Sequence, residues 1–254
     1  MIIDLIPFNN KLDTLLMRLN CHDFVDKFYI TEFRHNIIGQ PKPLHIQDNW
    51  HLFERFKDRI EYRVYDKFPN LSSFQCSDYW RDLLLDEIRQ LPTDTIVINT
   101  DKDEIIDSRK IGNYTGGVMT LEMSLYVYYL NLYSGRWING TICTVDDLKD
   151  KKLSMLRYVN TNRAYEHGVL NNMGWHFSWL GGYKAFKEKY DTFGKQEGWD
   201  ARLTDEAYVN TILRDKIRFW DKGELELVPI DGSYPNEIRY NLNKYTEHIY
   251  EAFL

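Results

Sequence analysis

Residues 94–105 read DTIVINTDKDEI, and this stretch decides the fold. The apolar run Ile96–Ile98 leads into the acids Asp101, Asp103 and Glu104, as a buried parallel strand does when it ends at a polar site. Ligands of open α/β sheets bind at the carboxyl ends of the strands. The acidic cluster is therefore where a functional site is expected.

Asp101 and Asp103 lie two residues apart, so their side chains point the same way if the segment is extended. Their carboxylates are hard oxygen ligands suited to Mg²⁺ or Mn²⁺. An isolated Asp-x-Asp is usually a solvated turn, but a buried strand rarely ends in clustered acids without a counter-charge. We therefore expect a divalent cation here, with Glu104 on the opposite face bracing the site.

The first half of the chain predicts strands and helices in alternation. Strands are expected at Ile2–Ile6, Val25–Thr31 and Ile60–Tyr65. Helical spacing of apolar residues follows the first strand (Leu12, Leu15, Leu16, Leu19) and recurs at 51–56 and 78–91, and residues 69–77 are expected to be a linker. The repeated order strand, helix, strand indicates an α/β fold with a doubly wound, mostly parallel sheet.

The second half of the chain has a different pattern of apolar and turn-forming residues. Gly116-Gly117 predicts a turn, and the mixed period of residues 118–132 predicts a small antiparallel portion of the sheet. Helices are expected at 183–190, at 207–214 after the cap Thr204-Asp205-Glu206, and from Pro235 or Asn236 to Phe253 as a C-terminal helix. We expect one domain over residues 1–254.

Composition excludes several classes of protein. The net charge is −6 and no basic block stands out, so a nucleic-acid groove is not expected. The three cysteines are far apart and without zinc spacing, which is typical of reduced thiols in a cytosolic protein. No apolar run approaches the length of a membrane span, and the N-terminus is too short and acidic for a signal peptide, so we expect a cytoplasmic location without a transmembrane segment.

Four blocks occur in a recognisable order: Ile6–Asp13 with Arg18-Leu19, Gly39–Leu44, Asp101–Ile105 and Gly174–Trp179. In these blocks the chain resembles glycosyltransferase family 17, the bisecting β-1,4-mannosyl-glycoprotein N-acetylglucosaminyltransferases. The last block, GWHFSW, is the most specific. Phe177 stands where the animal members have a cysteine, and Ile106 stands where they have a proline.

The resemblance implies a GT-A-like, metal-dependent, inverting transferase. It would move a sugar, within this family N-acetylglucosamine, from a UDP-sugar donor to a hydroxyl group of a glycan or glycoconjugate acceptor. The implied metal ligands are Asp103, Asp101 and His176. Asp101 could instead reach the ribose, and His176 could instead donate to a phosphate oxygen. A histidine between two tryptophans is otherwise a packed core residue.

An inverting transfer needs a carboxylate as general base on the acceptor side. Asp205 and Glu206 at a helix start are candidates, although acids there also act as ordinary caps. Glu122 is the rival candidate for the base. Its structural alternative is an ordinary charged residue on the outer face of an edge strand.

Other side chains are expected to hold the donor. Arg81 precedes the acidic strand and could bind the diphosphate or uracil, or make a surface ion pair. Asn9, Asn10 and Glu32 follow the first two strands, where base and ribose would bind, or serve as turn and capping residues. Trp175 and Trp179 could stack on sugar rings or pack in the core.

Two other functions remain open. A metal-dependent phosphohydrolase or nuclease would keep the acids but needs two metals, and the sequence lacks a second cluster of His and Asp. A non-catalytic carbohydrate-binding protein on the same fold would bind glycan without nucleotide or metal. The sequence does not indicate an oligomeric state.

Overall fold

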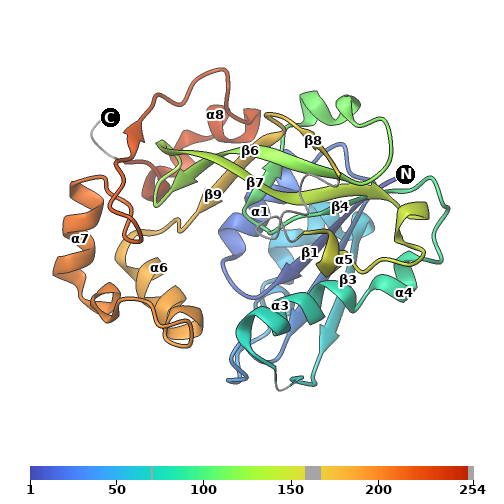
Figure 1. Ribbon diagram of the computed structural model, residues 1–254, viewed down its shortest axis with the longest axis horizontal. Coiled ribbons are helices and arrows are strands. Elements are labelled where there is room, and N and C mark those ends of the chain that lie inside the picture. Colours follow the sequence, from blue (N-terminus) through green and yellow to red (C-terminus); the bar gives the residue numbers. More distant parts are fainter. Residues whose placement is uncertain (70, 158–166, 251–254) are drawn as a thin grey trace. The chain divides into compact units, whose positions relative to one another are not determined.

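The computed structural model describes residues 1–69, 71–157 and 167–250, and the chain forms two compact units (Figure 1). Unit 1 comprises residues 1–123 and 138–174, and unit 2 comprises residues 124–137 and those from 175 onward. Strands β6 (Met119–Val127) and β7 (Leu132–Thr144) run through both units. The single domain expected from the sequence stays a prediction.

Unit 1 is built on a parallel sheet. Its strands are β1 (Ile2–Phe8), β2 (Lys27–Phe33), β3 (Ile60–Tyr65) and β4 (Ile96–Asn99), in the spatial order β3-β2-β1-β4. All their mutual pairings are parallel, and the register sets Leu5 of β1 between Tyr29 and Asn99. β7 then pairs with β4 in the antiparallel direction. The predicted mostly parallel sheet with an antiparallel portion is confirmed.

Both faces of this sheet are buried, because side chains alternate along each strand. One apolar cluster joins Ile6, Phe28 and Ile98 to α1 (Leu12–Cys21). A second cluster joins Ile3, Tyr29 and Val97 to α4 (Leu85–Ile88) and α5 (Leu153–Leu156). The first cluster also includes α2 (His45–Asp48) and the 3₁₀ segment Trp50–Arg59. Helical elements thus cover both faces, which confirms the doubly wound fold.

The helix predicted over 78–91 is two shorter pieces. α3 (Ser73–Asp82) begins inside the predicted linker, because Ser72 and Gln75 form a capping box there. The chain then breaks at Leu83 and Leu84 before α4 begins. Residues 51–56 are likewise a 3₁₀ segment rather than an α-helix. Spacing of apolar residues locates a helical face, but it does not reveal such breaks.

β5 (Glu104–Ile106) and β8 (Gly168–Leu170) complete the strands of unit 1. Beside β5, a side chain at Gly174 would place its Cβ 2.0 Å from the Ile105 carbonyl oxygen. Only glycine permits this approach of two backbones. The first residue of the GWHFSW block is therefore fixed by packing.

Unit 2 combines short strands with helices. β9 (Gly174–Ser178) pairs with β6, and β10 (Glu226–Leu227) pairs with β7. Its helices are α6 (Gly182–Lys189), α7 (Glu206–Arg214) and α8 (Asn236–Tyr240). Val127, Trp179, Phe186, Leu203 and Ile212 belong to its apolar core. The predicted helices at 183–190 and 207–214 are thus confirmed within about one residue.

The antiparallel portion expected at residues 118–132 is present: β6 lies beside β7, and residues 128–131, which join them, are too few for a parallel crossover. β6 also pairs in parallel with β8 in unit 1 and with β9 in unit 2, which the sequence pattern could not give, because strands of either direction show the same period. The expected length of the C-terminal helix was wrong. The C-terminal helix ends at Tyr240, where the Asn241 side chain bonds the Glu237 carbonyl, and only 3₁₀ turns follow up to His248. Phe253, its predicted end, lies outside the described residues.

Candidate active site

The acidic stretch after β4 is a tight turn. The Asp101 carbonyl accepts a hydrogen bond from the Glu104 amide at 2.9 Å, which closes a β-turn over Lys102 and Asp103. The expectation of an extended segment with both aspartates on one side is therefore wrong. The turn closes because the groups beneath it are strong hydrogen-bond donors.

Arg18 of α1 is the donor beneath the turn. Its side chain is fully buried, and its guanidinium donates to the carbonyls of Asp101 and Glu104, the latter at 2.6 Å. It also donates to the Thr100 hydroxyl at 2.5 Å and to both oxygens of Asp4. One guanidinium therefore fixes the backbone on both sides of the turn.

Asp4 and His22 support Arg18 from the interior. Burial raises the pKa of Asp4, but the charge of Arg18 and the hydrogen bond from His22 outweigh it and lower this pKa to about 2. Burial lowers the pKa of His22, so the ring is neutral. Its Nδ1 donates to Asp4 at 2.8 Å, and its Nε2 accepts from the Ile106 amide at 2.9 Å. The neutral tautomer is therefore defined by its two partners.

The side chains of the turn carry a second ionic cluster. Arg157, after α5, binds both oxygens of Glu104 at 2.7 and 2.8 Å and also contacts Asp101. The other Asp101 oxygen accepts from Arg81 of α3.

Burial and the charge of Arg157 lower the pKa of Arg81, and the charge of Asp101 opposes this shift. Burial raises the pKa of Asp101, but Arg157 and Arg81 outweigh it, so the net direction is down. Asp101 is therefore ionised.

Glu104 has the bracing role expected for it, although in a turn. Its side chain is fully buried and accepts from the Asp101 amide at 2.8 Å in addition to Arg157. Burial opposes the charged form of Arg157, but Asp101 and Glu104 outweigh this effect and raise its pKa. The carboxylate of Glu104 thus holds Arg157 against the turn.

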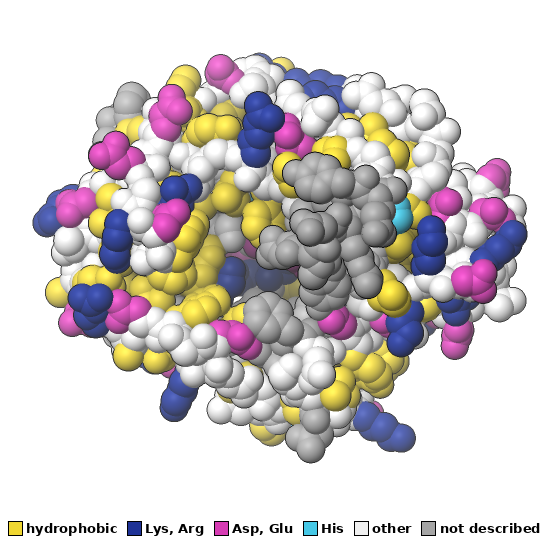
Figure 2. All heavy atoms as spheres, viewed as in Figure 1, with side chains coloured by type: hydrophobic (Ala, Val, Ile, Leu, Met, Phe, Trp, Pro, Cys, Tyr) yellow, Lys and Arg dark blue, Asp and Glu magenta, His cyan; other side chains and the backbone are white. Residues whose placement is uncertain are grey.

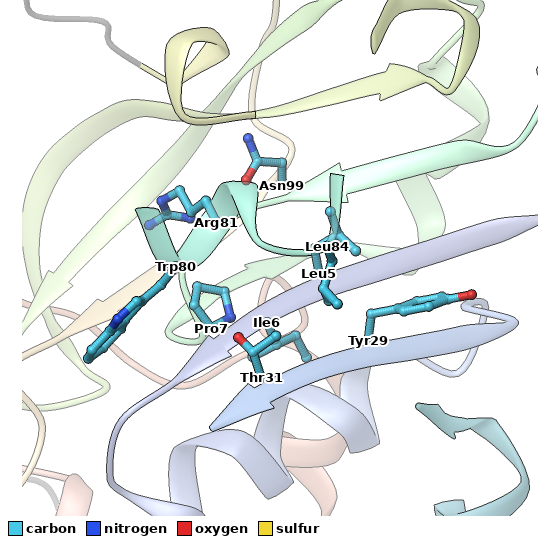
Figure 3. A pocket seen from close by; sticks show the side chains of 9 residues that line it. All are labelled: Leu5, Ile6, Pro7, Tyr29, Thr31, Trp80, Arg81, Leu84 and Asn99. Carbon is cyan, nitrogen blue, oxygen red and sulfur yellow. The ribbon is translucent and has the colours of Figure 1, made fainter. Parts of the chain in front are cut away.

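A narrow pocket opens beside Arg81 at the carboxyl ends of β1, β2 and β4 (Figure 3). Pro7, Thr31 and Asn99 contribute from the strands, and Trp80 and Arg81 contribute from α3. The centre of a water molecule can reach only about 10 Å³ of it, which is room for one polar atom of a ligand and not for a nucleobase. The pocket therefore presents donors to a ligand that extends beyond it.

Two donors of this pocket are buried and have no hydrogen-bond partner among the described residues. They are Nη1 of Arg81 and Nε1 of Trp80, whose residues are 7% and 5% exposed. The Trp80 ring stacks on Phe33 with centroids 4.1 Å apart, so its position is fixed by packing. A buried donor without an acceptor costs about 1–3 kcal/mol, which makes this edge of the sheet suited to an acceptor from outside the chain.

The three residues predicted to hold base and ribose, Asn9, Asn10 and Glu32, differ in their burial and in their hydrogen bonds. Asn9 follows β1, and its Oδ1 is buried without a partner among the described residues. Asn10 lies next to it and is half-buried. Glu32 is fully buried at the end of β2, where it binds the amides of His45 and Ile46, the Tyr62 hydroxyl and Lys42. Glu32 thus caps α2, the alternative that the sequence left open, and its contact with a nucleotide stays a prediction.

The GWHFSW block contributes mainly to packing. Trp179 lies in the core of unit 2 against Phe186, Trp199 and Phe219. His176 is 6% exposed, and its ring lies 4.6 Å from that of Trp137, while Trp175 is 5% exposed. These positions match the core alternative, and the roles of His176 with metal and Trp175 with donor stay predictions.

The candidate bases lie on different elements. Asp205 is the N-cap of α7, where its Oδ1 accepts from the amides of Ala207 at 2.8 Å and Tyr208 at 3.3 Å. Glu206 is the exposed first residue of that helix. Glu122 lies on β6 and is only 9% exposed, so it does not occupy the outer position considered for it. Asp205 and Glu206 belong to unit 2, and Glu122 belongs to unit 1.

Asp101 is engaged by arginines in place of a metal ion, and the metal roles of Asp101 and Asp103 stay predictions. Both oxygens of Asp101 are bonded to arginines. Within the described ranges, no three His, Cys, Asp or Glu side chains come together as metal ligands. Ligation by Asp101 would require it to leave at least one arginine.

Sequence reasoning assigned no site role to four residues of this cluster: Asp4, Arg18, His22 and Arg157. Asp4 left one signal, because a charged residue inside the apolar run Ile2–Ile6 needs a buried partner. Arg157 left none, since it lies 53 residues from Glu104 and contacts it only through the fold.

On the face shown in Figure 2, acidic and basic side chains of the described residues are interspersed. This agrees with the absence of a basic block in the sequence. Within the described residues, no helix has both the length and the apolar character that crossing a bilayer demands. A cytoplasmic location stays a prediction.

Comparisons with known proteins identify relatives at two levels. The sequence profile of "Glycosyltransferase family 17" matches residues 1–210, which is most of the chain. No curated protein matches. Among solved structures, the chain is similar to GalNAc-T7 with UDP, GalNAc and Mn²⁺, at 9% identity and a TM-score of 0.44. The match covers 87% of this chain and 52% of that one, so the chain spans about half the length of that protein.

Proposed function

The chain belongs to glycosyltransferase family 17, and on this premise we propose that it transfers N-acetylglucosamine from a UDP-sugar to a glycan or glycoconjugate hydroxyl group. Family membership makes the protein a nucleotide-sugar-dependent glycosyltransferase. The nucleotide, the sugar and inversion of configuration are proposed from the resemblance of the four sequence blocks.

One observation carries the proposal: Nη1 of Arg81 is buried at the carboxyl ends of β1, β2 and β4 and has no hydrogen-bond partner among the described residues. Asp101 holds the other end of this guanidinium, so the donor is fixed before a ligand binds. A diphosphate supplies the missing acceptor oxygens, and arginine suits phosphate because its planar group donates in a fixed geometry. The site is at the sheet edge where ligands of parallel α/β folds bind.

The chemistry assigns a task to each group. The acceptor oxygen attacks the anomeric carbon as the bond from that carbon to the diphosphate oxygen breaks. Arg81 stabilises the negative charge that develops on the leaving diphosphate. A carboxylate takes the proton of the acceptor hydroxyl. We propose Glu206 for this role before Asp205, because the Asp205 carboxylate already caps α7. Glu122 remains the candidate from unit 1.

Metal dependence is a separate proposal from glycosyl transfer. The arginines on Asp101 supply positive charge at the turn, and this supports a site in which arginine contributes to neutralising the diphosphate. UDP release measured with Mn²⁺ and after chelation tests the requirement directly. Full turnover in excess chelator would contradict metal dependence. Loss of activity that added Mn²⁺ restores, together with inactivity of Asp103→Ala, would support metal dependence.

The decisive experiment measures UDP binding and UDP-sugar turnover in Arg81→Met. A bound donor stabilises the native protein by mass action, so UDP and UDP-N-acetylglucosamine should raise the melting temperature of the wild type. We expect Arg81→Met to lose this rise and to lose turnover by about 100-fold or more. Lys57→Gln is the control, because Lys57 is an exposed cation of unit 1 that pairs with the exposed Glu54 at 3.5 Å.

An unchanged UDP-dependent shift in Arg81→Met would show that the donor binds elsewhere. Phosphate release from UDP or from nucleic acid without a sugar acceptor would favour the hydrolase alternative instead.

A further inference from the structure

Unit 2 contains an open groove that the donor chemistry does not use. Its volume is about 340 Å³, at the lower end of the roughly 300–1,000 Å³ typical of small-molecule sites. The residues that carry the argument are Tyr126, Tyr133, Glu226, Asp231, Ser233 and Tyr234. The groove therefore joins three aromatic rings with two carboxylates and a hydroxyl.

The floor of the groove is aromatic and fixed. The Tyr126 ring lies 5.6 Å from Tyr133 and 5.3 Å from Tyr234 between centroids. Tyr126 and Tyr234 are 6% and 1% exposed, and the Tyr234 hydroxyl donates to the Leu130 carbonyl at 3.0 Å. Tyr133 is half-buried, so part of its surface remains open to a ligand. The buried rings of Tyr126 and Tyr234 therefore pack beneath the Tyr133 ring, which remains accessible.

The rim of the groove is acidic. Glu226 is exposed and lies directly opposite Tyr133 in the pairing of β10 with β7. Asp231 is held by an Asx turn, in which its Oδ1 accepts from the Ser233 amide at 2.8 Å. Hydrogen bonds from Ser233 lower the pKa of Asp231, so it is ionised near neutral pH. Fixed acceptors thus stand beside the ring surface.

We propose that this groove binds an uncharged sugar ring of a glycan. The C–H face of a pyranose packs on an aromatic ring, and its hydroxyl groups donate to carboxylates, which is the combination that Tyr133, Glu226 and Asp231 present. The described residues that line the groove include no lysine or arginine, so anionic sugars are disfavoured. Glycan binding stands by itself, whereas its role as the acceptor subsite rests on the proposed function.

The test uses the full chain and saturation-transfer NMR with two neutral probes, N,N′-diacetylchitobiose and mannobiose. Tyr133→Ala removes the open ring, and we expect its dissociation constant for the bound disaccharide to rise about tenfold or more. Tyr133→Phe keeps the ring and should retain most of the affinity. Glu226→Gln should weaken binding by a smaller factor because the amide still accepts a hydrogen bond.

Tyr240→Ala is the matched control, because Tyr240 is a tyrosine of unit 2 that is 74% exposed and does not line the groove. Sialyllactose tests the expected rejection of anions, and a lysine-rich peptide tests a cationic ligand. Equal affinities in Tyr133→Ala and wild type, or preference for the peptide, would overturn the proposal.

UDP binding measured on the same samples separates this proposal from the proposed function. Glycan binding without any UDP binding would contradict the transferase proposal and leave the groove assigned. UDP binding with no response to either disaccharide at millimolar concentration would contradict the groove alone.

Discussion

The buried pair of Asp4 and Arg18 couples the turn at residues 101–104 to pH. Asp4 has a folded-state pKa of about 2, below the ordinary value of 3.8 that it has when unfolded. Its ionised form therefore stabilises the fold fully above about pH 4, and this contribution of about 2 kcal/mol is lost as pH falls toward 2. Urea unfolding at several pH values measures it.

Asp4→Asn separates this effect from general acid sensitivity. The variant leaves Arg18 buried without its counter-charge and should be about 3–5 kcal/mol less stable at pH 7, with a flatter dependence between pH 4 and 2. Asp86→Asn is the control, because Asp86 is 98% exposed. An acid profile of Asp4→Asn parallel to that of the wild type would assign the acid loss to other carboxylates.

Arg157 gives a second prediction at the scale of single residues. Its guanidinium spans Glu104 and Asp101, and a lysine cannot reproduce two-pronged binding. We expect Arg157→Lys to lower the free energy of unfolding by about 1–3 kcal/mol. Arg202→Lys breaks a similar two-pronged pair with Asp200 on the surface and should change stability by about 0.5 kcal/mol or less. Equal losses of unfolding free energy in Arg157→Lys and Arg202→Lys would show that burial adds nothing to the stability contributed by the Arg157 ion pair.

At the scale of elements, α7 distinguishes a cap from a base. Asp205→Asn keeps a good N-cap and should change stability by only a few tenths of a kcal/mol, whereas Asp205→Ala should cost about 1 kcal/mol. If Glu206 is the base, Glu206→Gln loses turnover by about 100-fold and Asp205→Asn does not. Thermal unfolding and UDP release on the same proteins measure both effects. Loss of turnover in Asp205→Asn at unchanged stability would move the base to Asp205.

The elements show which parts of the fold the sequence could predict. β3 was predicted at its observed bounds, Ile60–Tyr65, because strand alternation and its flanking turns are local signals. The turn at residues 101–104 could not be, since it depends on Arg18, which lies 83 residues away from Asp101. Arg81 was predicted to bind the diphosphate or uracil, or to make a surface ion pair. Its buried guanidinium makes an ion pair with Asp101, because a helix before a strand returns to the sheet edge, and its contact with a nucleotide stays a prediction. The parallel pairing of β6 with β8 and β9 was missed because it depends on partners from later in the chain.

At the scale of the whole molecule, the chain has separate apolar cores in units 1 and 2, yet β6 and β7 run through both units. If either core unfolds, each of these strands loses its partners in that unit and is left with only part of its pairing, so we expect one cooperative transition in calorimetry, as the prediction of a single domain requires.

Leu15→Ala and Leu203→Ala are matched probes, because each removes a fully buried leucine from a different core. Each should cost about 2–5 kcal/mol and lower the same melting temperature by about 5–15 °C. Equal calorimetric and van't Hoff enthalpies in both variants would support one folding unit. Two transitions, each shifted by only one of the variants, would instead make units 1 and 2 independent domains, since a shared strand would then hold its structure with only half of its partners.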